Sequence, residues 1–182
     1  MARMLLALIS PLLFLPAPAL AEPPTQTTET LQPFECGSVK KLHTLGGVFL
    51  AGQPAPADFE HVKNAGIRTV INLRLEDELE WNEKALVKEL GLSYVSIPFK
   101  TPESLTDAVF DEARAVLNDA EQKPILLHCA SANRVGAVWL VHRVLDGGIT
   151  YEEALAEAKT VGLALPAYET RAQEYIKARE KK

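Results

Sequence analysis

The sequence has little cysteine, no excess of basic residues and, beyond its first residues, no long apolar run. Cys36 and Cys129 are the two cysteines among 182 residues, too few for the disulfide framework that stabilises small secreted domains. Neither they nor the four histidines show the spacing of metal ligands, so no metal and no cofactor is expected. Lysine and arginine total 19 against 24 aspartates and glutamates, a formal net charge of −5. A chain of this charge is not expected to bind nucleic acid.

The first residues differ in composition from the remainder of the chain. A basic residue near the start, an apolar stretch over 5–15 and small residues up to Ala21 are typical of a secretory signal peptide. We therefore expect a signal peptide over residues 1–21 and a periplasmic or secreted mature protein with no stable membrane insertion. Residues 22–37 begin with a polar stretch rich in proline and threonine, which predicts a disordered linker.

Residues 38–182 are expected to form one domain, in which short apolar runs alternate with segments of helical periodicity. Strands are predicted at 48–51, 67–73, 92–97 and 124–128. Helices are predicted at 57–65, 76–90, 104–120, 133–146, 150–161 and 166–181. Single helices between strands imply crossover connections, so the predicted fold is α/β, with a mostly parallel sheet of four to five strands flanked by helices.

Ligands of such sheets bind beyond the carboxyl ends of the strands. The predicted strand ends bring Gln53, Arg74, Lys100 and Cys129 to that edge of the sheet. We therefore expect the functional site there.

The stretch after the last predicted strand is the most informative part of the chain. Residues 129–134 (CASANR) join that strand to a helix that is apolar around its whole circumference. Such a helix must be buried, so its N-terminus is fixed in space. Its first backbone N–H groups and its dipole form a seat for an anion, and Arg134 adds a guanidinium that donates two parallel hydrogen bonds to an oxyanion. The residues whose backbone is expected to surround the anion are Ala130, Ser131, Ala132 and Asn133.

Cys129 lies at the rim of this predicted anion seat. The thiolate is the nucleophilic form of cysteine, and a helix N-terminus together with a nearby guanidinium favours it. The alternative is a small buried cysteine at a strand end, which is common for free cysteines. The agreement of strand, loop, arginine and helix favours the anion-binding cysteine site.

At His128, Cys129 and Arg134 the sequence resembles the protein tyrosine and dual-specificity phosphatase superfamily, whose signature is His-Cys, a small loop and then Arg. It is most similar to the bacterial phosphatase-like branch found in beta-lactamase-hydrolase-like proteins. Further matches are Gly-Gln-Pro at 52–54 and Val-Ile-Asn-Leu-Arg at 70–74, and the likeness runs over about residues 38–178. The resemblance implies that Cys129 forms a phosphocysteine, that Arg134 clamps the phosphate and that the backbone of 130–134 cradles it.

Two features depart from the pattern of the superfamily. Four residues instead of five separate Cys129 from Arg134, and this shorter loop resembles that of rhodanese-type sulfurtransferases. Val135 also replaces the hydroxyl residue that normally follows the arginine, a role for which Ser131 is a candidate substitute.

The general acid that protonates the leaving oxygen is normally an aspartate on a neighbouring loop. The loop after the third predicted strand has no aspartate, and Glu103 is its nearest carboxylate, with Asp107 a turn further along. Acidic residues at these positions also favour a helix N-terminus for electrostatic reasons alone. We predict a catalytic role for Glu103. Arg74 is expected either to contact substrate or to pair with an acidic residue of the following turn.

These observations predict an exported cysteine-dependent phosphatase that hydrolyses a phosphorylated protein or small molecule. The alternatives are a sulfurtransferase or persulfide carrier that uses the same thiolate, and a non-catalytic module that binds phosphate. Cys36 is expected to be a free thiol, although a disulfide with Cys129 is the alternative in an oxidising compartment.

Overall fold

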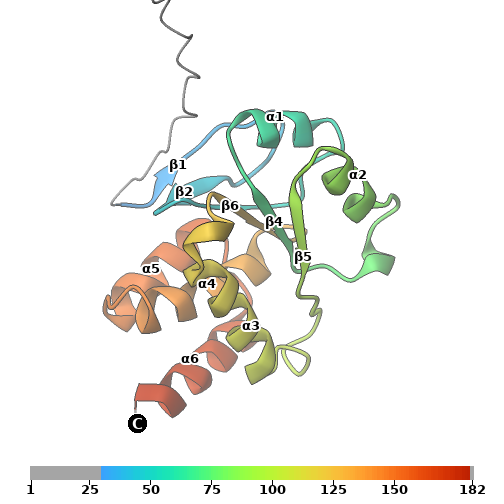
Figure 1. The fold of residues 1–182 in the computed structure, drawn as a ribbon. Helices are drawn as coiled ribbons and strands as arrows, with labels where there is room; N and C mark the ends of the chain where they lie inside the picture. Colours follow the sequence, from blue (N-terminus) through green and yellow to red (C-terminus); the bar gives the residue numbers. More distant parts are fainter. Residues whose placement is uncertain (1–29, 181–182) are drawn as a thin grey trace, which may run out of the picture.

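The computed structural model describes residues 30–180, and within them a central sheet lies between two layers of helices (Figure 1). The strands are β1 (Gln32–Pro33), β2 (His43–Leu45), β3 (Val48–Ala51), β4 (Thr69–Asn72), β5 (Ser93–Ser96) and β6 (Ile125–His128). The α-helices are α1 (Asp58–Asn64), α2 (Glu83–Glu89), α3 (Asp107–Asn118), α4 (Asn133–Leu145), α5 (Tyr151–Val161) and α6 (Pro166–Glu180). Two 3-10 turns, η1 (Glu76–Glu78) and η2 (Ala120–Gln122), complete the set.

The strand order in the sheet is β1-β2-β3-β6-β4-β5. The pairs β3–β6, β6–β4 and β4–β5 are parallel, whereas β1–β2 and β2–β3 are antiparallel. The predicted α/β fold with a mostly parallel sheet is therefore confirmed, but the sheet has six strands instead of four to five. The two additional strands contain two and three residues, too short to give a periodic signal.

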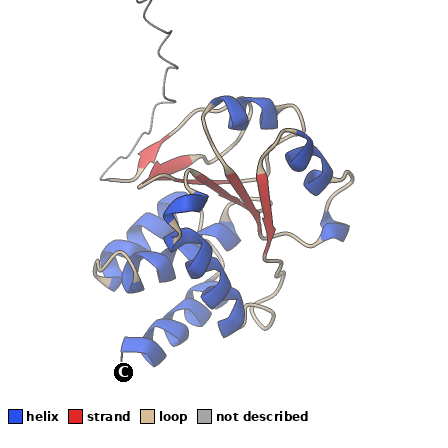
Figure 2. Ribbon diagram, viewed as in Figure 1, coloured by secondary structure: helices blue, strands red, loops and turns tan. Residues whose placement is uncertain are grey.

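The sheet separates two hydrophobic cores because successive side chains of a strand point to opposite faces. On β6, Leu126 packs with α1 and α2, whereas Ile125 and Leu127 belong to the core formed with α3 to α6. Figure 2 shows the same division, with α1 and α2 on one side of the strands and the remaining long helices on the other. Both faces of the parallel strands are covered, as parallel sheets require.

Helix α4 runs through the larger core, and its residues from Arg134 to His142 are all buried. This confirms the prediction of a buried helix directly after the Cys–Arg loop. Gly136 permits the close approach of the turn after α5, because a Cβ atom at this position would lie 2.7 Å from the Cβ of Leu163 and 2.8 Å from the carbonyl oxygen of Ala158.

The predicted linker over 22–37 overlaps the fold at its C-terminal end. Pro33 pairs with His43 across β1 and β2, the rings of Phe34 and Phe49 are 5.0 Å apart, and Cys36 is buried. Residues 32–36 therefore join the domain. The predicted signal peptide over 1–21 lies outside the described residues. Within 30–180, no helix combines the length and apolarity that crossing a bilayer demands.

The helix predicted over 76–90 is divided into η1 and α2. The side chain of Asn82 accepts a hydrogen bond from the N–H of Ala85, which caps a new helix beginning at Glu83. In η1, the Glu78 carboxylate accepts a bond from the N–H of Leu75 and is turned toward Arg134. The interruption therefore delivers two carboxylates, Glu78 and Glu83, to the edge of the sheet.

Candidate active site

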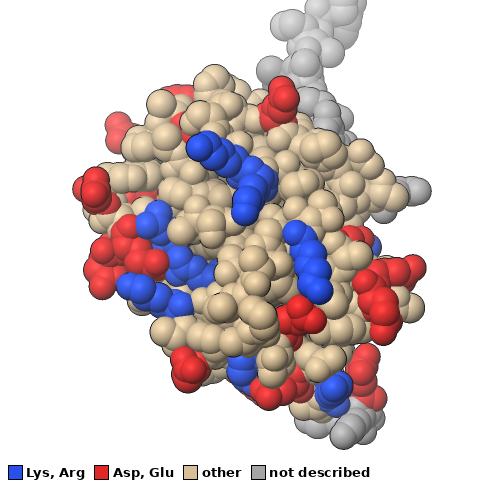
Figure 3. Space-filling model, turned by 180° about the vertical axis from the view of Figure 1, so that it is seen from behind, with Lys and Arg blue, Asp and Glu red and all other residues tan. Residues whose placement is uncertain are grey.

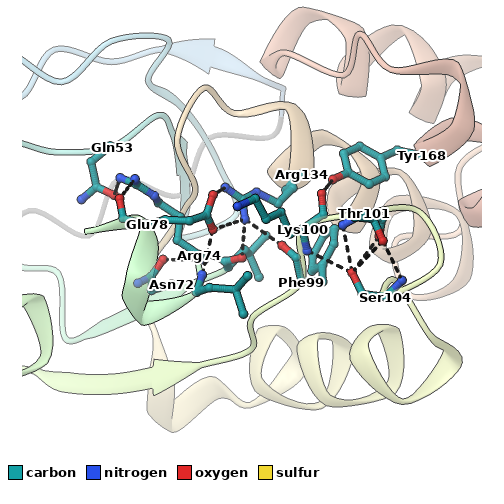
Figure 4. Close-up of polar contacts among 12 residues, drawn as sticks. Gln53, Asn72, Arg74, Glu78, Phe99, Lys100, Thr101, Ser104, Arg134 and Tyr168 are labelled. Atoms are coloured by element: carbon teal, nitrogen blue, oxygen red, sulfur yellow. Dashed lines mark hydrogen bonds and ion pairs between the residues drawn. The ribbon is translucent and has the colours of Figure 1, made fainter. Parts of the chain in front are cut away.

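The carboxyl ends of β3, β4 and β6 lie side by side, as the parallel register requires. The loop after β6 is attached to the end of β3, because Ala130 accepts a hydrogen bond of 3.2 Å from the N–H of Gln53. Gln53 Oε1 in turn accepts a bond of 2.7 Å from Arg74 Nη1, which follows β4 (Figure 4). The predicted convergence of Gln53, Arg74 and Cys129 at one edge is thus confirmed.

The loop over 129–134 has a fixed shape. Ala132 adopts a left-handed conformation with φ 66° and forms the N-cap of α4, which turns the chain sharply from the loop into the helix. Asn133 Oδ1 accepts bonds from the N–H groups of Ala164 and Leu165, so the base of the loop is tied to the segment after α5. Gly162 lies against the loop, where an added Cβ would be 3.0 Å from that of Ala132.

Cys129 and Arg134 meet at the start of α4. The Cys129 side chain is almost fully buried, with 1% of the residue exposed, and Arg134 is 7% exposed. The first backbone N–H groups of α4 have no acceptor within the helix, which makes this end of the helix suitable for an anion. The loop, the cysteine and the arginine are therefore brought together as predicted.

The guanidinium of Arg134 is held by protein acceptors on one side. Nη1 donates to Glu78 Oε2 at 2.8 Å and to the carbonyl oxygens of Leu73 and Phe99 at 3.1 and 2.7 Å, and Nη2 donates to Glu78 Oε1 at 3.0 Å (Figure 4). A guanidinium has five N–H donors. These contacts occupy both hydrogens of Nη1 and one of Nη2, which leaves Nε and the second hydrogen of Nη2 with no partner among residues 30–180. Two adjacent donors are the arrangement that a guanidinium uses to bind an oxyanion.

Glu78 stabilises this arrangement electrostatically. Hydrogen bonds from Arg134 outweigh the effect of partial burial and lower the pKa of Glu78, with the positive charge of Arg74 acting in the same direction. Burial by itself lowers the pKa of Arg134, but the hydrogen bond and the charge of Glu78 reverse that effect and raise it. Arg134 is therefore positively charged in the site, beside an ionised carboxylate.

A second buried pair lies behind the cysteine. His128, which precedes Cys129, has its Nε2 2.9 Å from Glu83 Oε1, and both side chains are fully buried. Glu83 Oε2 accepts a bond of 2.6 Å from Gln53 Nε2. Burial raises the pKa of Glu83, but the charge and hydrogen bond of His128 and the bonds from Gln53 and Tyr94 lower it overall. A chain of polar contacts therefore runs from Arg74 through Gln53 and Glu83 to His128.

The side chain of Arg74 donates hydrogen bonds to other residues of the protein. Besides Gln53, it donates from Nη2 to the carbonyl oxygen of Glu78 (Figure 4), and its backbone N–H is bound by the side chain of Asn72. Of the two expectations for Arg74, pairing with the following turn therefore holds, although through a backbone oxygen instead of a carboxylate.

The loop after β5 carries Glu103, whose carboxylate is fully exposed. Hydrogen bonds from the Thr101 side chain and from its own backbone lower the pKa of Glu103. Asp107, the other acid considered, forms ion pairs with Arg171 and Arg179 at 3.3 Å each. It therefore belongs to a cluster of ion pairs on the surface.

Tyr168 of α6 is also a site residue. Its hydroxyl donates to the carbonyl oxygen of Lys100 at 2.7 Å (Figure 4). Burial raises the pKa of Tyr168, and the negative charge of Glu78 adds to this against the opposing charge of Arg134. Glu78, Glu83 and Tyr168 were missed because their partners lie far away in the sequence.

The remaining thiol is Cys36, and both cysteines are free. Among residues 30–180, no three histidine, cysteine, aspartate or glutamate side chains are grouped closely enough to hold a metal ion.

Comparison with known proteins agrees with this geometry. Beta-lactamase hydrolase-like protein of Agrobacterium fabrum is 29% identical over 123 residues, which cover 65% of this chain and 28% of that protein. Inositol diphosphatase DSP4 of Arabidopsis thaliana is 30% identical over 99 residues, covering 50% of this chain and 48% of the relative. The chain thus spans less than half the length of these curated relatives.

Two solved structures share the fold. The core catalytic domain of the PP-IP phosphatase SIW14 from S. cerevisiae matches with a TM-score of 0.66 and 16% identity, covering 84% of this chain and 92% of the other. TpbA from P. aeruginosa matches with a TM-score of 0.63 and 18% identity, covering 81% and 89%. A family model described as DSP-PTPase phosphatase fused to NAD+ kinase matches residues 40–174. The chain therefore belongs to this family of phosphatases of the protein tyrosine and dual-specificity type.

Proposed function

We propose that the protein hydrolyses phosphomonoesters through a phosphocysteine intermediate on Cys129. In the first step the thiolate attacks phosphorus, the S–P bond forms and the P–O bond to the leaving group breaks. In the second step a water molecule attacks the phosphocysteine, the S–P bond breaks, and inorganic phosphate and the thiolate are released. No metal takes part in this scheme.

The observation that carries this proposal is the pairing of buried Cys129 with an arginine that is already fixed in orientation. Because Glu78 and two carbonyl oxygens hold one side of Arg134, little side-chain entropy remains to be lost when its other donors bind a phosphoryl group. Preorganised donors of this kind stabilise the charge that develops in the transition state. The backbone N–H groups over 130–134 are proposed to bind the remaining phosphoryl oxygens.

Three assignments within this scheme come from the sequence and need direct tests. Glu103 is proposed to protonate the leaving oxygen, and Ser131 is proposed to take the place of the hydroxyl that Val135 lacks in the hydrolysis of the intermediate. Arg74 is proposed as a substrate-binding residue through its position at the same edge of the sheet. Its engagement with Gln53 and Glu78 limits it to a peripheral contact.

The decisive experiment is hydrolysis of p-nitrophenyl phosphate by the protein and its variants. Cys129→Ser should lower kcat more than ~10³-fold, and Arg134→Lys should lower it ~10²- to 10³-fold because a lysine cannot present two fixed donors. Cys36→Ser is the matched control and should retain activity. Trapping of a phosphorylated Cys129 in an acid-quenched reaction, detected by mass spectrometry, would establish the intermediate, and a turnover without dependence on Cys129 would refute the proposal.

A second candidate activity, sulfur transfer, is favoured by one observation, the four residues between Cys129 and Arg134. In that reaction thiosulfate would transfer its outer sulfur to Cys129 with release of sulfite, and cyanide would then remove the sulfur as thiocyanate. Cyanolysis of the thiosulfate-treated protein measures this directly. Phosphate binding without either activity would support a non-catalytic module.

We also propose that the protein is exported. The support is the signal-like sequence over 1–21, with Ala21 as the last residue removed. Intact mass of the protein recovered from a periplasmic or culture fraction should correspond to a chain beginning at Glu22. A full-length chain retained in the cytoplasm would contradict export and would leave the proposed reaction unaffected.

A further inference from the structure

A pocket of about 380 Å³ opens directly beside the Cys–Arg loop. It is lined by Ser38, Lys40, Lys41, Gly52, Gln53, Ala55, Ala130 and Ser131, and we call it the lysine pocket. Ala130 and Ser131 are the two residues that follow the proposed nucleophile, so the pocket lies against the first half of the Cys–Arg loop. Ligand pockets in proteins span roughly 300–1,000 Å³, and this one has room for a small charged group.

Two lysines give the pocket its charge. Lys40 and Lys41 are both exposed, and within residues 30–180 neither forms an ion pair. Lys41 Nζ lies 3.5 Å from the carbonyl oxygen of Ser131, which places the ammonium at the rim of the loop. On the face drawn in Figure 3, basic side chains stand in small separate groups and do not form one continuous field. The attraction for anions is therefore local.

The backbone that carries the lysines is held firmly. Lys40 accepts a hydrogen bond of 3.1 Å from the N–H of Gly52 at the end of β3. Lys41 has φ 54°, a left-handed conformation that few residues other than glycine adopt. A non-glycine residue keeps such a conformation where its surroundings enforce it, and such positions cluster at binding sites.

The acidic residue behind the pocket already has its carboxylate oxygens occupied by hydrogen bonds. Asp58 accepts bonds from the N–H and the hydroxyl of Ser38 at 2.7 and 2.8 Å, and from the N–H of Ala55 at 2.8 Å. Asp58 is buried, with only 4% of the residue exposed. Asp58 therefore shapes the wall of the pocket by fixing Ser38 and Ala55, while the two ammonium groups remain available to a ligand.

We propose that the lysine pocket binds a second phosphoryl group of the substrate, next to the one that Cys129 attacks. This inference rests on the proposed phosphatase function and narrows its substrate class to small molecules with two neighbouring phosphoryl groups, joined as an anhydride or carried on adjacent ester oxygens. A phosphate dianion beside two unpaired ammonium groups forms charge-assisted hydrogen bonds. A monoester with a neutral leaving group leaves both lysines without a partner.

Binding is measured first, in the Cys129→Ser protein, with inorganic phosphate and inorganic pyrophosphate as probes in isothermal titration calorimetry. Pyrophosphate should bind at least ~10-fold more tightly than phosphate. The variant Lys40→Gln/Lys41→Asn should remove most of this difference, and asparagine is chosen because it tolerates a left-handed backbone. Lys63→Gln/Lys88→Gln, which changes two exposed lysines on α1 and α2, is the matched control and should keep the difference.

Turnover is measured next, with p-nitrophenyl phosphate, myo-inositol 4-monophosphate and myo-inositol 4,5-bisphosphate. In the lysine variant, kcat/KM for the bisphosphate should fall at least ~10-fold more than kcat/KM for either monoester. Lysine-dependent binding of pyrophosphate without lysine-dependent turnover of the inositol bisphosphate assigns the anhydride. Lysine-dependent turnover of the inositol bisphosphate assigns adjacent esters. Dependence on the lysines that occurs only with an acidic phosphopeptide would overturn the proposed substrate class.

The two proposals fail in different ways. If pyrophosphate binds no more tightly than phosphate, or if both lysine pairs affect it equally, the second phosphoryl site is refuted whatever the activity. If pyrophosphate binding depends on Lys40 and Lys41 but no phosphate ester is hydrolysed, the binding site stands and the proposed reaction is refuted. Circular dichroism of each variant confirms that folding is retained before either conclusion is drawn.

Discussion

His128 Nε2 lies 2.9 Å from Glu83 Oε1 in a pair whose side chains are both completely buried. The residue before the proposed nucleophile is thereby fixed by the first residue of α2. Gln53 binds the other oxygen of the same carboxylate, so the ends of β3 and β6 and the start of α2 share one polar network. The Gln53 bond satisfies one carboxylate oxygen, whereas His128 Nε2 and Glu83 Oε1 are held by their close contact alone, and His128 Nδ1 has no hydrogen-bond partner among residues 30–180.

We expect Glu83→Gln to lower kcat for p-nitrophenyl phosphate about tenfold, equivalent to about 1.4 kcal/mol in the activation barrier, with KM changed less than about twofold. The reason is that an amide holds His128 less firmly than an ionised carboxylate, so Cys129 is positioned less well. Steady-state kinetics from pH 5 to 8, together with the rate of iodoacetamide alkylation of Cys129, provide the measurement.

Two variants control this experiment. Glu80→Gln changes an exposed carboxylate that lines a pocket together with Glu83 and should leave kinetics unchanged, while Glu83→Asp should restore part of the lost activity. A fall in thermal stability with unchanged kcat and alkylation would show that Glu83 supports the fold without positioning the cysteine.

The Arg134–Glu78 pair predicts a pH-dependent contribution to stability. The pKa of Glu78 is lowered in the folded protein, so its carboxylate stabilises the fold above its unfolded pKa of about 4.3 and this contribution is lost as pH falls through the lower, folded value. Glu78→Gln should therefore reduce the free energy of unfolding by about 2 kcal/mol at pH 7, and less as the pH approaches 3. Urea denaturation at several pH values measures it.

The exposed neighbour Asp77 supplies the control for this prediction, since Asp77→Asn removes the same charge without touching Arg134. Glu78→Gln should also raise KM for phosphate esters, because Arg134 then loses the partner that orients it. A difference between wild type and Glu78→Gln that stays constant down to pH 3 would contradict the assignment of the effect to an ionised Glu78.

The proposed general acid makes a prediction about the pH–rate profile. A general acid acts in its protonated form, and the pKa of Glu103 is lowered by the Thr101 side chain and its own backbone. If Glu103 protonates the leaving oxygen, turnover of alkyl phosphates should rise as the pH falls toward 4.5 and Glu103→Gln should abolish this rise. Glu112→Gln, an exposed carboxylate on α3, is the control.

Aryl phosphates test the same assignment independently. A good leaving group such as p-nitrophenolate needs little protonation, so Glu103→Gln should affect p-nitrophenyl phosphate far less than an alkyl phosphate. An equal effect on both substrates would remove Glu103 from the proton-transfer step.

Much of the fold could be read from periodicity. The strand at Val48–Ala51 and the helix that begins at Asn133 follow from apolar runs bounded by small or turn residues, and the helix predicted from residue 150 begins with a capping box of Thr150 and Glu153. β2 was missed because three residues carry too little pattern. The division of 76–90 was missed because the charged stretch is helical in composition, whereas the bond that Arg134 donates to Glu78, across 56 positions, decides its shape.

The candidate site was predictable where its chemistry is contiguous in the sequence. Residues 129–134 form one short loop between an apolar strand and an apolar helix, so Cys129 and Arg134 could be predicted as site residues from this pattern and from the family resemblance. Glu83 was not identified, because its partner His128 lies 45 residues away and only the parallel register of β3, β4 and β6 brings them together. The lysine pocket was likewise hidden, since Lys40 and Lys41 lie in the segment where the predicted linker meets the domain.

Gly136 yields a prediction about how α4 is packed. Because Gly136 has no side chain, Leu163 can pack directly against the helix. An added Cβ would lie 2.7 Å from Leu163 Cβ and 2.8 Å from both the Ala158 carbonyl oxygen and the Leu163 nitrogen. Two of these three atoms belong to the backbone and cannot rotate away. Gly136→Ala should therefore lower the free energy of unfolding by up to about 2 kcal/mol, because an overpacking cost of about 1–3 kcal/mol is set against a gain in helix propensity of about 1 kcal/mol.

Urea denaturation of Gly136→Ala tests this packing, and Ala115→Gly, exposed on α3, measures the helix-propensity contribution in the same protein. Because the segment after α5 also binds Asn133 through Ala164 and Leu165, a displaced Leu163 should disturb the base of the Cys–Arg loop. We expect KM for p-nitrophenyl phosphate to rise in Gly136→Ala and to stay unchanged in Ala115→Gly. Unchanged stability and kinetics in Gly136→Ala would mean that this turn can move away from α4 without cost to the loop.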